Sequence, residues 1–307
     1  MKKVSHTART SRATVATGGQ LLRRAVTRLT RARLHYGHGT ESAVDDAAAL
    51  LAHAKGLKRP LEARDLEAPV AARAQLRFAQ LLGRRIDERV PVVYLTQRCW
   101  FAGIPFYVDE RVLIPRSPIA ELIENRFAPW VDADAVRSIV DLGTGSGCIA
   151  LAAALAFPRA RVDAVDISRD ALEVARINRT ALRLTRRVRL VHSDFFGRLA
   201  GRRYDIIVSN PPYVGTTEFN GLPPEYGHEP AGALRSGRDG MDAVTVLLER
   251  SARHLSDTGV LVVEVGNTES RLRRAFPKLP FVWLSFERGG GGVFLLTAAQ
   301  LKQAGLD

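Results

Sequence analysis

Cysteine is almost absent from this chain of 307 residues: Cys99 and Cys148 are the two present, and they form no CxxC pair. This rules out a disulfide scaffold and a structural zinc site built on cysteines, and it favours a reducing compartment such as the cytoplasm. No apolar run approaches the roughly 18–20 residues that span a bilayer, so we expect no membrane-spanning helix. No apolar segment follows the N-terminal charges either, which argues against a secretory signal.

Acidic residues are missing from the first 40 residues, which hold nine of the 45 lysines and arginines. The rest of the chain is nearly balanced, with 36 basic against 32 acidic residues, so the net charge of +13 belongs mainly to this end. Three explanations stay open: contact with the phosphates of RNA or of a ribonucleoprotein surface, a solvated tail, or an organellar transit peptide. The composition, 46% hydrophobic and 25% charged, is that of a globular protein.

The hydrophobic pattern divides the chain into four predicted parts. Residues 1–19 are small and polar without periodicity, which predicts a flexible basic tail. Apolar residues at helical spacing predict a small helical domain over 20–91, with helices beginning near Gln20, Ser42 and Pro69. β-prone residues around a glycine predict a hairpin connector over 92–115. Residues 116–307 then alternate strand and helix.

This alternation predicts an α/β fold whose core is a seven-stranded, Rossmann-like sheet. Five expected parallel strands are followed by two C-terminal strands, and we expect one of these to run antiparallel at the edge of the sheet. The expected strands are 138–142, 161–165, 188–192, 204–209, 259–266, 281–286 and 292–297.

A glycine-rich loop, Asp141-Leu142-Gly143-Thr144-Gly145-Ser146-Gly147, follows the first of these strands. Glycines permit a tight turn and let a ligand approach the backbone. The GxGxG spacing differs from the GxGxxG of dinucleotide enzymes and from the GxxxxGK[ST] of phosphate-binding loops. Because the loop lacks a phosphate-binding lysine and Asp141 favours a cation, it suits a nucleoside with a cationic group, such as S-adenosylmethionine. A plain turn is the alternative.

Aspartates end the next two strands as well. Asp166 follows Asp141 by 25 residues and can accept hydrogen bonds from ribose hydroxyls, while Asp194 is placed to meet an adenine amino group. Ligands bind outside the carboxyl ends of parallel strands, so three such acids strengthen the S-adenosylmethionine prediction. The predicted cofactor-binding residues are Asp141, Gly143, Thr144, Gly145, Gly147, Asp166, Ile167, Asp194, Phe195 and Asn210.

A second chemical loop, Asn210-Pro211-Pro212-Tyr213, follows the strand 204–209. The prolines remove backbone donors and leave the carbonyls of Asn210 and Pro211 as acceptors. Asn210 adds a side-chain carbonyl, and Tyr213 offers a flat face for stacking. Such a site can hold both N–H bonds of a planar amino group and direct its nitrogen towards a methyl donor. A protein amide and a flipped nucleobase both remain open as substrates.

With this tetrapeptide the chain resembles the HemK family of N(5)-glutamine methyltransferases, from about residue 20 to the C-terminus. The stretches Val112-Leu113-Ile114-Pro115-Arg116, Glu229-Pro230 and Gly237-Arg238-Asp239-Gly240 share the resemblance. It implies a class I methyltransferase fold and S-adenosylmethionine as methyl donor. Residues 115–123 and 225–230 depart from the branch that modifies release factors. They are similar to the PrmB-type branch, which implies a glutamine of large-subunit ribosomal protein three as substrate.

The resemblance also implies roles for individual residues. The implied catalytic residues are Asn210, Pro211, Pro212 and Tyr213, and the implied substrate-binding residues are Arg116, Asn210, Pro211, Tyr213 and Glu229. No metal is implied, and His228 and Glu225 are the candidates for a general base. The alternatives are a release-factor glutamine methyltransferase, an amino-methyltransferase of ribosomal RNA or DNA, and a non-catalytic adapter. The intact acids and tetrapeptide argue against the adapter.

Overall fold

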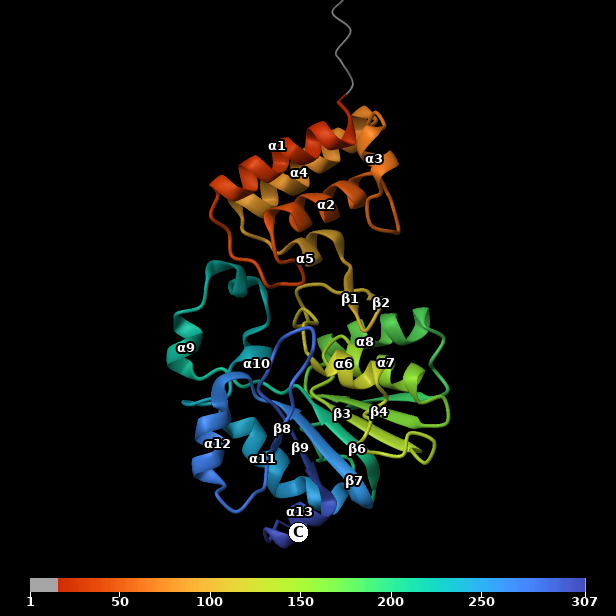
Figure 1. The fold of residues 1–307 in the computed structure, drawn as a ribbon, viewed down its shortest axis with the longest axis vertical. Coiled ribbons are helices and arrows are strands. Elements are labelled where there is room, and N and C mark those ends of the chain that lie inside the picture. Colours follow the sequence, from red (N-terminus) through yellow and green to blue (C-terminus); the bar gives the residue numbers. More distant parts are fainter. Residues whose placement is uncertain (1–15, 307) are drawn as a thin grey trace, which may run out of the picture. The chain divides into compact units, whose positions relative to one another are not determined.

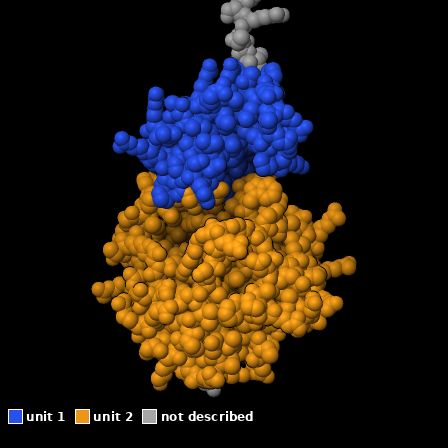
Figure 2. Space-filling model, in the orientation of Figure 1, with its two compact units in different colours: residues 1–36, 40–96 blue, residues 37–39, 97–307 orange. Residues whose placement is uncertain are grey.

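The computed structural model describes residues 16–306. They form two compact units, which Figure 2 shows in different colours. Of the described residues, the first unit comprises 16–36 and Thr40–Thr96, and the second comprises Gly37–Gly39 and 97–306. Most of the predicted tail, residues 1–15, lies outside the described residues.

The first unit is helical (Figure 1). Its helices are α1 (Gly18–Arg31), α2 (Ala43–Ala54), α3 (Ala63–Glu67), α4 (Ala72–Asp87) and α5 (Val92–Thr96). Helix α1 begins two residues before the predicted start because Thr17 and Gln20 form a capping box: Gln20 N donates to Thr17 Oγ1 over 3.4 Å, and Thr17 N donates to Gln20 Oε1 over 3.0 Å. Ala25 and Leu29 then bury one face of the helix.

Two parts of this unit were not anticipated correctly. Helix α3 was not predicted, and Val92–Thr96 forms a helix where the sequence favoured β structure. The backbone nitrogens of Tyr94 and Leu95 both donate to the Pro91 carbonyl, which starts the helical turn. All four apolar side chains from Val92 to Leu95 are buried, so packing overrides the β propensity of valine and tyrosine. The predicted hairpin is therefore shorter, β1 (Cys99–Phe101) paired with β2 (Ile104–Phe106).

The second unit contains a seven-stranded sheet of order β5-β4-β3-β6-β7-β9-β8. Its strands are β3 (Ser138–Leu142), β4 (Arg161–Asp166), β5 (Val188–His192), β6 (Tyr204–Ser209), β7 (Leu255–Glu264), β8 (Val282–Trp283) and β9 (Val293–Thr297). The five strands from β3 to β7 run parallel, as predicted. The seven-stranded, Rossmann-like prediction is confirmed.

The placement of the antiparallel strand was wrong. Strand β9 is antiparallel to both of its neighbours and lies between β7 and the short edge strand β8. The side chains of Val293–Leu296 are all buried, and a strand that is apolar on both faces is accommodated inside a sheet rather than at its edge.

Helices cover both faces of this sheet (Figure 1). The helices of this unit are α6 (Ile119–Glu124), α7 (Cys148–Ala156), α8 (Arg169–Ala181), α9 (Thr216–Asn220), α10 (Ala231–Leu234), α11 (Asp242–Ser251), α12 (Glu269–Ala275) and α13 (Ala298–Gln303). Ile139 of β3 packs in one apolar cluster with α6 and α7, while its neighbour Val140 packs in another with α11 and α13. Because helices cover both faces of the sheet, a ligand can reach it at the carboxyl ends of the parallel strands, where the loops that follow the strands lie. No described helix is long and apolar enough to cross a membrane.

Candidate active site

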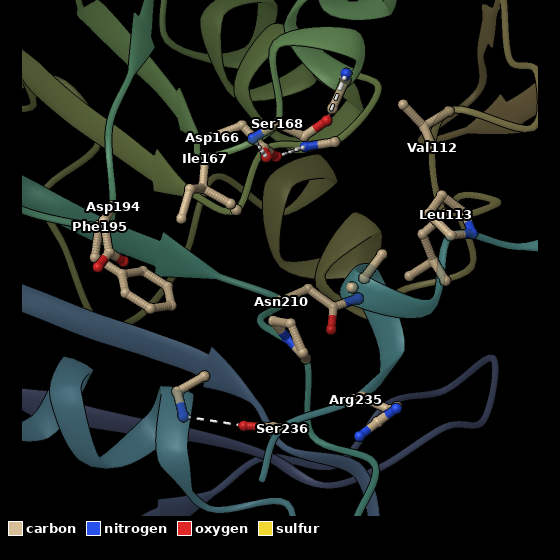
Figure 3. A pocket seen from close by; sticks show the side chains of 18 of the residues that line it. Val112, Leu113, Asp166, Ile167, Ser168, Asp194, Phe195, Asn210, Arg235 and Ser236 are labelled. Atoms are coloured by element: carbon tan, nitrogen blue, oxygen red, sulfur yellow. Dashed lines mark hydrogen bonds between the residues drawn. The ribbon is translucent and has the colours of Figure 1, made fainter. Parts of the chain in front are cut away.

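A cavity of about 510 Å³ lies at the carboxyl ends of the parallel strands, within the usual size range of small-molecule sites. Seven of the predicted cofactor-binding residues line it: Gly143, Gly145, Asp166, Ile167, Asp194, Phe195 and Asn210. Figure 3 shows Asn210 near the middle of this cavity, with Asp166 and Ser168 to one side and Arg235 and Ser236 to the other. The structure therefore brings both chemical loops to one cavity.

The glycine loop passes directly beside Asn210. Strands β3 and β6 pair Leu142 with Ser209, so the residues that follow them, Gly143 and Asn210, leave the sheet side by side. Gly143 has a φ of 76°, and a Cβ built on it would lie 3.9 Å from the Asn210 carbonyl oxygen. Gly147, with a φ of 80°, begins helix α7, where a Cβ would come within 3.1 Å of the Ala175 Cβ. Glycine is required here for backbone conformation and for close packing.

Asp166, the last residue of β4, is held by two backbone donors. Its Oδ2 accepts from Gly145 N and its Oδ1 accepts from Ser168 N, both over 2.8 Å. Burial raises the pKa of Asp166, and these backbone hydrogen bonds oppose that rise. Each carboxylate oxygen can accept a second hydrogen bond, so the group can still receive the two hydroxyls of a ribose.

Asp194 and Phe195 follow β5 and line the same cavity. Asp194 is exposed, so its carboxylate is available to a ligand. Phe195 has a φ of 38°, a left-handed conformation that is uncommon for a non-glycine residue. Such backbone strain is found disproportionately at binding sites, and the sequence contains no signal for it.

Asp141 does not line the cavity. Its side chain is fully buried beneath the glycine loop, where Oδ2 accepts from Thr144 Oγ1 over 2.5 Å and from Ala150 N over 3.1 Å. Burial raises the pKa of Asp141 to about 7. These contacts brace the loop and the start of α7. Thr144 and Gly147 also lie outside the cavity lining, so direct cofactor contacts of all three residues stay predictions.

Asn210 offers an acceptor that the protein leaves unused. Its Oδ1 atom is buried and has no hydrogen-bond partner among the described residues. Within residues 16–306, no backbone N–H group donates a hydrogen bond to the carbonyl of Asn210 or of Pro211. A buried acceptor without a partner costs about 1–3 kcal/mol, which an N–H group of a ligand would offset. Pro212 lines the cavity beside Asn210, whereas Pro211 does not.

Tyr213 does not line the cavity. Its Oη donates to Glu264 Oε1 over 3.1 Å, and a Cβ on Gly266 would lie 2.5 Å from Tyr213 Cε2, so the ring packs against that glycine. Burial raises the pKa of both Tyr213 and Glu264. The ring therefore anchors the tetrapeptide to the end of β7. The predicted stacking of Tyr213 on a substrate stays a prediction.

Arg116 and Glu229 bind each other rather than line the cavity. Arg116 Nη1 donates to Glu229 Oε1 over 2.6 Å, and Nη2 donates to Oε2 over 2.8 Å. Ile114 N also donates to Oε1, over 3.0 Å. This pair fixes the segment that carries Val112 and Leu113, which do line the cavity. The predicted substrate contacts of Arg116 and Glu229 stay predictions.

Several cavity residues were not assigned from the sequence: Arg111, Val112, Leu113, Ser168, Ala171, Ser193, Pro230, Gly232, Ala233, Arg235, Ser236, Gly237, Asp242, Ala243 and Val246. Val112, Leu113 and Gly237 belong to stretches that carry the family resemblance, which could have marked them. Arg235 has no such signal; its guanidinium lies over the Phe219 ring, 5.5 Å from the centroid. His228 and the buried Glu225, the candidates for a general base, do not line the cavity.

Family models match both units of the chain. The model described as PrmC N-terminal domain matches residues 20–96, and the model described as Methyltransferase small domain matches residues 125–221. Together with a cavity lined by Gly143 and Gly145 of the glycine loop and by Asn210 and Pro212 of the Asn-Pro-Pro-Tyr turn, these matches define a class I methyltransferase whose methyl donor is S-adenosylmethionine.

Three curated relatives have the printed name ribosomal protein uL3 glutamine methyltransferase. The one from Neisseria meningitidis serogroup B is 46% identical over 282 residues, which are 92% of this chain and 93% of that protein. Those from Burkholderia pseudomallei and Bordetella pertussis are 45% and 46% identical, covering 92% of this chain and 94% and 95% of theirs. The chain belongs to the family of the ribosomal protein uL3 glutamine methyltransferases.

Proposed function

We propose that this chain transfers the methyl group of S-adenosylmethionine to the side-chain nitrogen of a glutamine in ribosomal protein uL3. Relatives with that name match nearly the whole of this chain and of their own length. The observation that carries the proposal is the buried, unpaired Oδ1 of Asn210 in a cavity wall that also contains Gly143. An acceptor placed there suits an amide N–H group.

The chemical difficulty of this reaction is the nucleophile. The lone pair of an amide nitrogen is delocalised into its carbonyl, and the donor, when bound, supplies a methyl group on a sulfonium. Asn210 Oδ1 and the Pro211 carbonyl would accept the two N–H bonds of the glutamine amide. This would orient the nitrogen and stabilise the positive charge that develops on it. Holding two reactants in line can supply up to ~7–11 kcal/mol, so positioning carries most of this mechanism.

The side chains and backbone groups of the cavity suit S-adenosylmethionine. The Asp166 carboxylate retains acceptor capacity for two ribose hydroxyls, and Gly143 and Gly145 leave the loop backbone open to close approach. Asp194 would accept from the adenine amino group, with Ile167 and Phe195 beside the ring.

Further parts of the proposal concern the rest of the chain. We assign substrate recognition to the helical domain 20–91, joined by residues 92–115 to the methyltransferase domain 116–307. The basic segment 1–40 would contact ribosomal RNA, since Arg23, Arg24 and Arg28 are exposed on α1. A cytoplasmic reaction is supported by a ribosomal substrate and by the free cysteines Cys99 and Cys148.

A competition between substrates tests the proposal. The full chain is incubated with methyl-labelled S-adenosylmethionine and purified uL3, a release factor or ribosomal RNA. We expect label on one glutamine of uL3, found as N5-methylglutamine by peptide mass spectrometry. Label confined to the release factor or to RNA would overturn the assignment. The Asn210→Ala variant should lose the signal, whereas Asn220→Ala, which removes an exposed carboxamide on α9, should keep it.

A further inference from the structure

A second hollow, of about 300 Å³, lies at the opposite end of the sheet from the active-site cavity. It involves the first residues of β4 and β5, whereas the active-site cavity lies beyond the last residues of the same strands. Six arginines and one carboxylate line it: Arg161, Arg179, Arg186, Arg187, Arg189, Arg202 and Asp163. The lining therefore has a large excess of positive charge.

The single carboxylate of this lining is already occupied. Arg189 Nε and Nη2 donate to the two oxygens of Asp163, each over 2.8 Å, and Arg202 Nη1 donates over 3.3 Å. Tyr204 Oη adds a fourth donor, over 2.6 Å. Asp163 thus holds two guanidinium groups in place, and its one charge cannot balance the six that surround it.

Two more arginines are fixed by backbone carbonyls, which carry no charge. Arg187 Nη1 donates to the carbonyls of Ala154 and Phe157, and Arg179 Nη1 donates to the Val188 carbonyl over 3.2 Å. Their positive charges therefore remain without a counter-charge. A frame of guanidinium groups held in this way loses little side-chain entropy when an anion binds.

Arg161 and Arg186 complete the hollow. Both side chains are exposed, and neither guanidinium makes a hydrogen bond or ion pair with the described residues. Exposed arginines continue beyond the hollow at Arg159, Arg183 and Arg203. The positive surface is therefore wider than one small anion needs.

We propose that this arginine hollow binds the phosphate backbone of RNA. Guanidinium groups match phosphate oxygens with paired, charge-assisted hydrogen bonds. The described lining holds no aromatic side chain for base stacking and little apolar surface for a protein partner, so the contacts suit a backbone that is recognised without regard to sequence. RNA is favoured over other polyanions because a ribosomal protein is the proposed substrate, and to that extent the inference rests on the proposed function.

The position of the hollow would let the protein bind RNA and a glutamine side chain at the same time. Because it lies at the amino ends of the strands, RNA bound there leaves the carboxyl-end cavity open to a glutamine side chain. RNA would then raise the local concentration of the enzyme at a ribosomal particle without entering the reaction.

The test measures RNA binding by the full chain in the absence of methyl donor. A fluorescein-labelled RNA hairpin is titrated by anisotropy between 50 and 200 mM KCl with wild type, with Arg161→Ala/Arg186→Ala, and with Arg250→Ala/Arg274→Ala. The last pair is a matched control, since both arginines are exposed and lie outside the hollow, on helices α11 and α12. Every variant keeps the same N-terminal charges, so the tail contributes equally.

The slope of log K, the RNA-binding constant, against log salt is negative. Loss of two phosphate contacts should make this slope shallower by ~1.4–1.8, which corresponds to roughly 14- to 30-fold weaker binding at 0.15 M salt. The single variants Arg161→Ala and Arg186→Ala, titrated in the same way, should each give about half of that change in slope. The control variant should match wild type. Ultraviolet crosslinks should fall in peptides that contain residues 159–163 and 183–189.

Equal binding by the double variant and the control would overturn the proposal. So would an equal loss of affinity for a polyglutamate peptide, which would make the hollow a general acidic-peptide site, or full displacement of RNA by millimolar inorganic phosphate. Methylation of free uL3 is measured separately and should be unchanged in the double variant. A wild-type chain that binds RNA through the hollow but fails to methylate uL3 would contradict the proposed function alone.

Discussion

Replacing Asn210 with alanine should make the protein inactive without making it less stable. Asn210 Oδ1 is buried in the cavity and has no hydrogen-bond partner among the described residues. Removing an unpaired acceptor therefore removes a desolvation cost of about 1–3 kcal/mol from the folded state. We expect the free energy of unfolding of Asn210→Ala to equal that of wild type or to exceed it by up to about this amount.

The same substitution should lower the catalytic rate, although it does not lower the free energy of unfolding. A preorganised group that stabilises charge in a transition state contributes about 10²–10³ in kcat, or ~2.7–4 kcal/mol. The loss should fall on kcat, because the Asp166 carboxylate and the glycine loop still hold the methyl donor. Binding of S-adenosylmethionine should therefore weaken by no more than about 2- to 13-fold, since one hydrogen bond between neutral groups contributes about 0.5–1.5 kcal/mol.

Three measurements on one protein preparation test this combination. Initial rates with purified uL3 give kcat, urea denaturation gives the free energy of unfolding, and isothermal titration calorimetry gives the Kd for S-adenosylmethionine. Asn220→Ala serves as the control, because its carboxamide is exposed on α9. A variant that retains near-wild-type kcat would refute the assigned role. A variant that loses activity together with several kcal/mol of stability would show instead that Asn210 is a structural residue.

Three further predictions concern neighbouring groups. Asp166→Ala should weaken S-adenosylmethionine binding at least tenfold by calorimetry, and unchanged affinity would contradict the ribose assignment. Tyr213→Phe should lower the free energy of unfolding by about 1–3 kcal/mol, because the buried Glu264 loses the Tyr213 hydroxyl as a hydrogen-bond donor, while the Kd for S-adenosylmethionine stays the same; unaltered stability would refute this anchor. Burial raises the pKa of Asp141 to about 7, so the folded state binds a proton that the unfolded state releases near pH 4. The free energy of unfolding of wild type should therefore fall relative to that of Asp141→Asn as the pH rises from 4 to 7. Urea denaturation measures both values, and a difference between them that stays constant across this range would contradict the prediction.

The central sheet could be predicted well because its signals are local. Each parallel strand is a short apolar run, and strands β3, β5 and β6 begin and end where the sequence indicated. Once the strands are parallel, the residues after them must meet at one edge. This is why Asp166, Asp194 and Asn210 could be placed in one cavity without coordinates.

The features that the sequence did not indicate depend on contacts made in the folded chain. Arg116 and Glu229 form their ion pair across 113 positions, so nothing near either residue indicates that they bind each other. The order of β8 and β9 also depends on packing, because β9 is buried on both faces. Asp141 was predicted to contact the cofactor, and only the structure shows that its carboxylate accepts hydrogen bonds from Thr144 and Ala150.

The most direct test of the account is a crystal structure of the chain with S-adenosylhomocysteine and a glutamine-containing peptide of uL3. The glutamine amide nitrogen should lie about 2.7–3.2 Å from Asn210 Oδ1 and from the Pro211 carbonyl oxygen, facing the sulfur of the cofactor product. A peptide bound with its amide elsewhere, or Asn210 Oδ1 paired with a protein donor in that complex, would contradict the account.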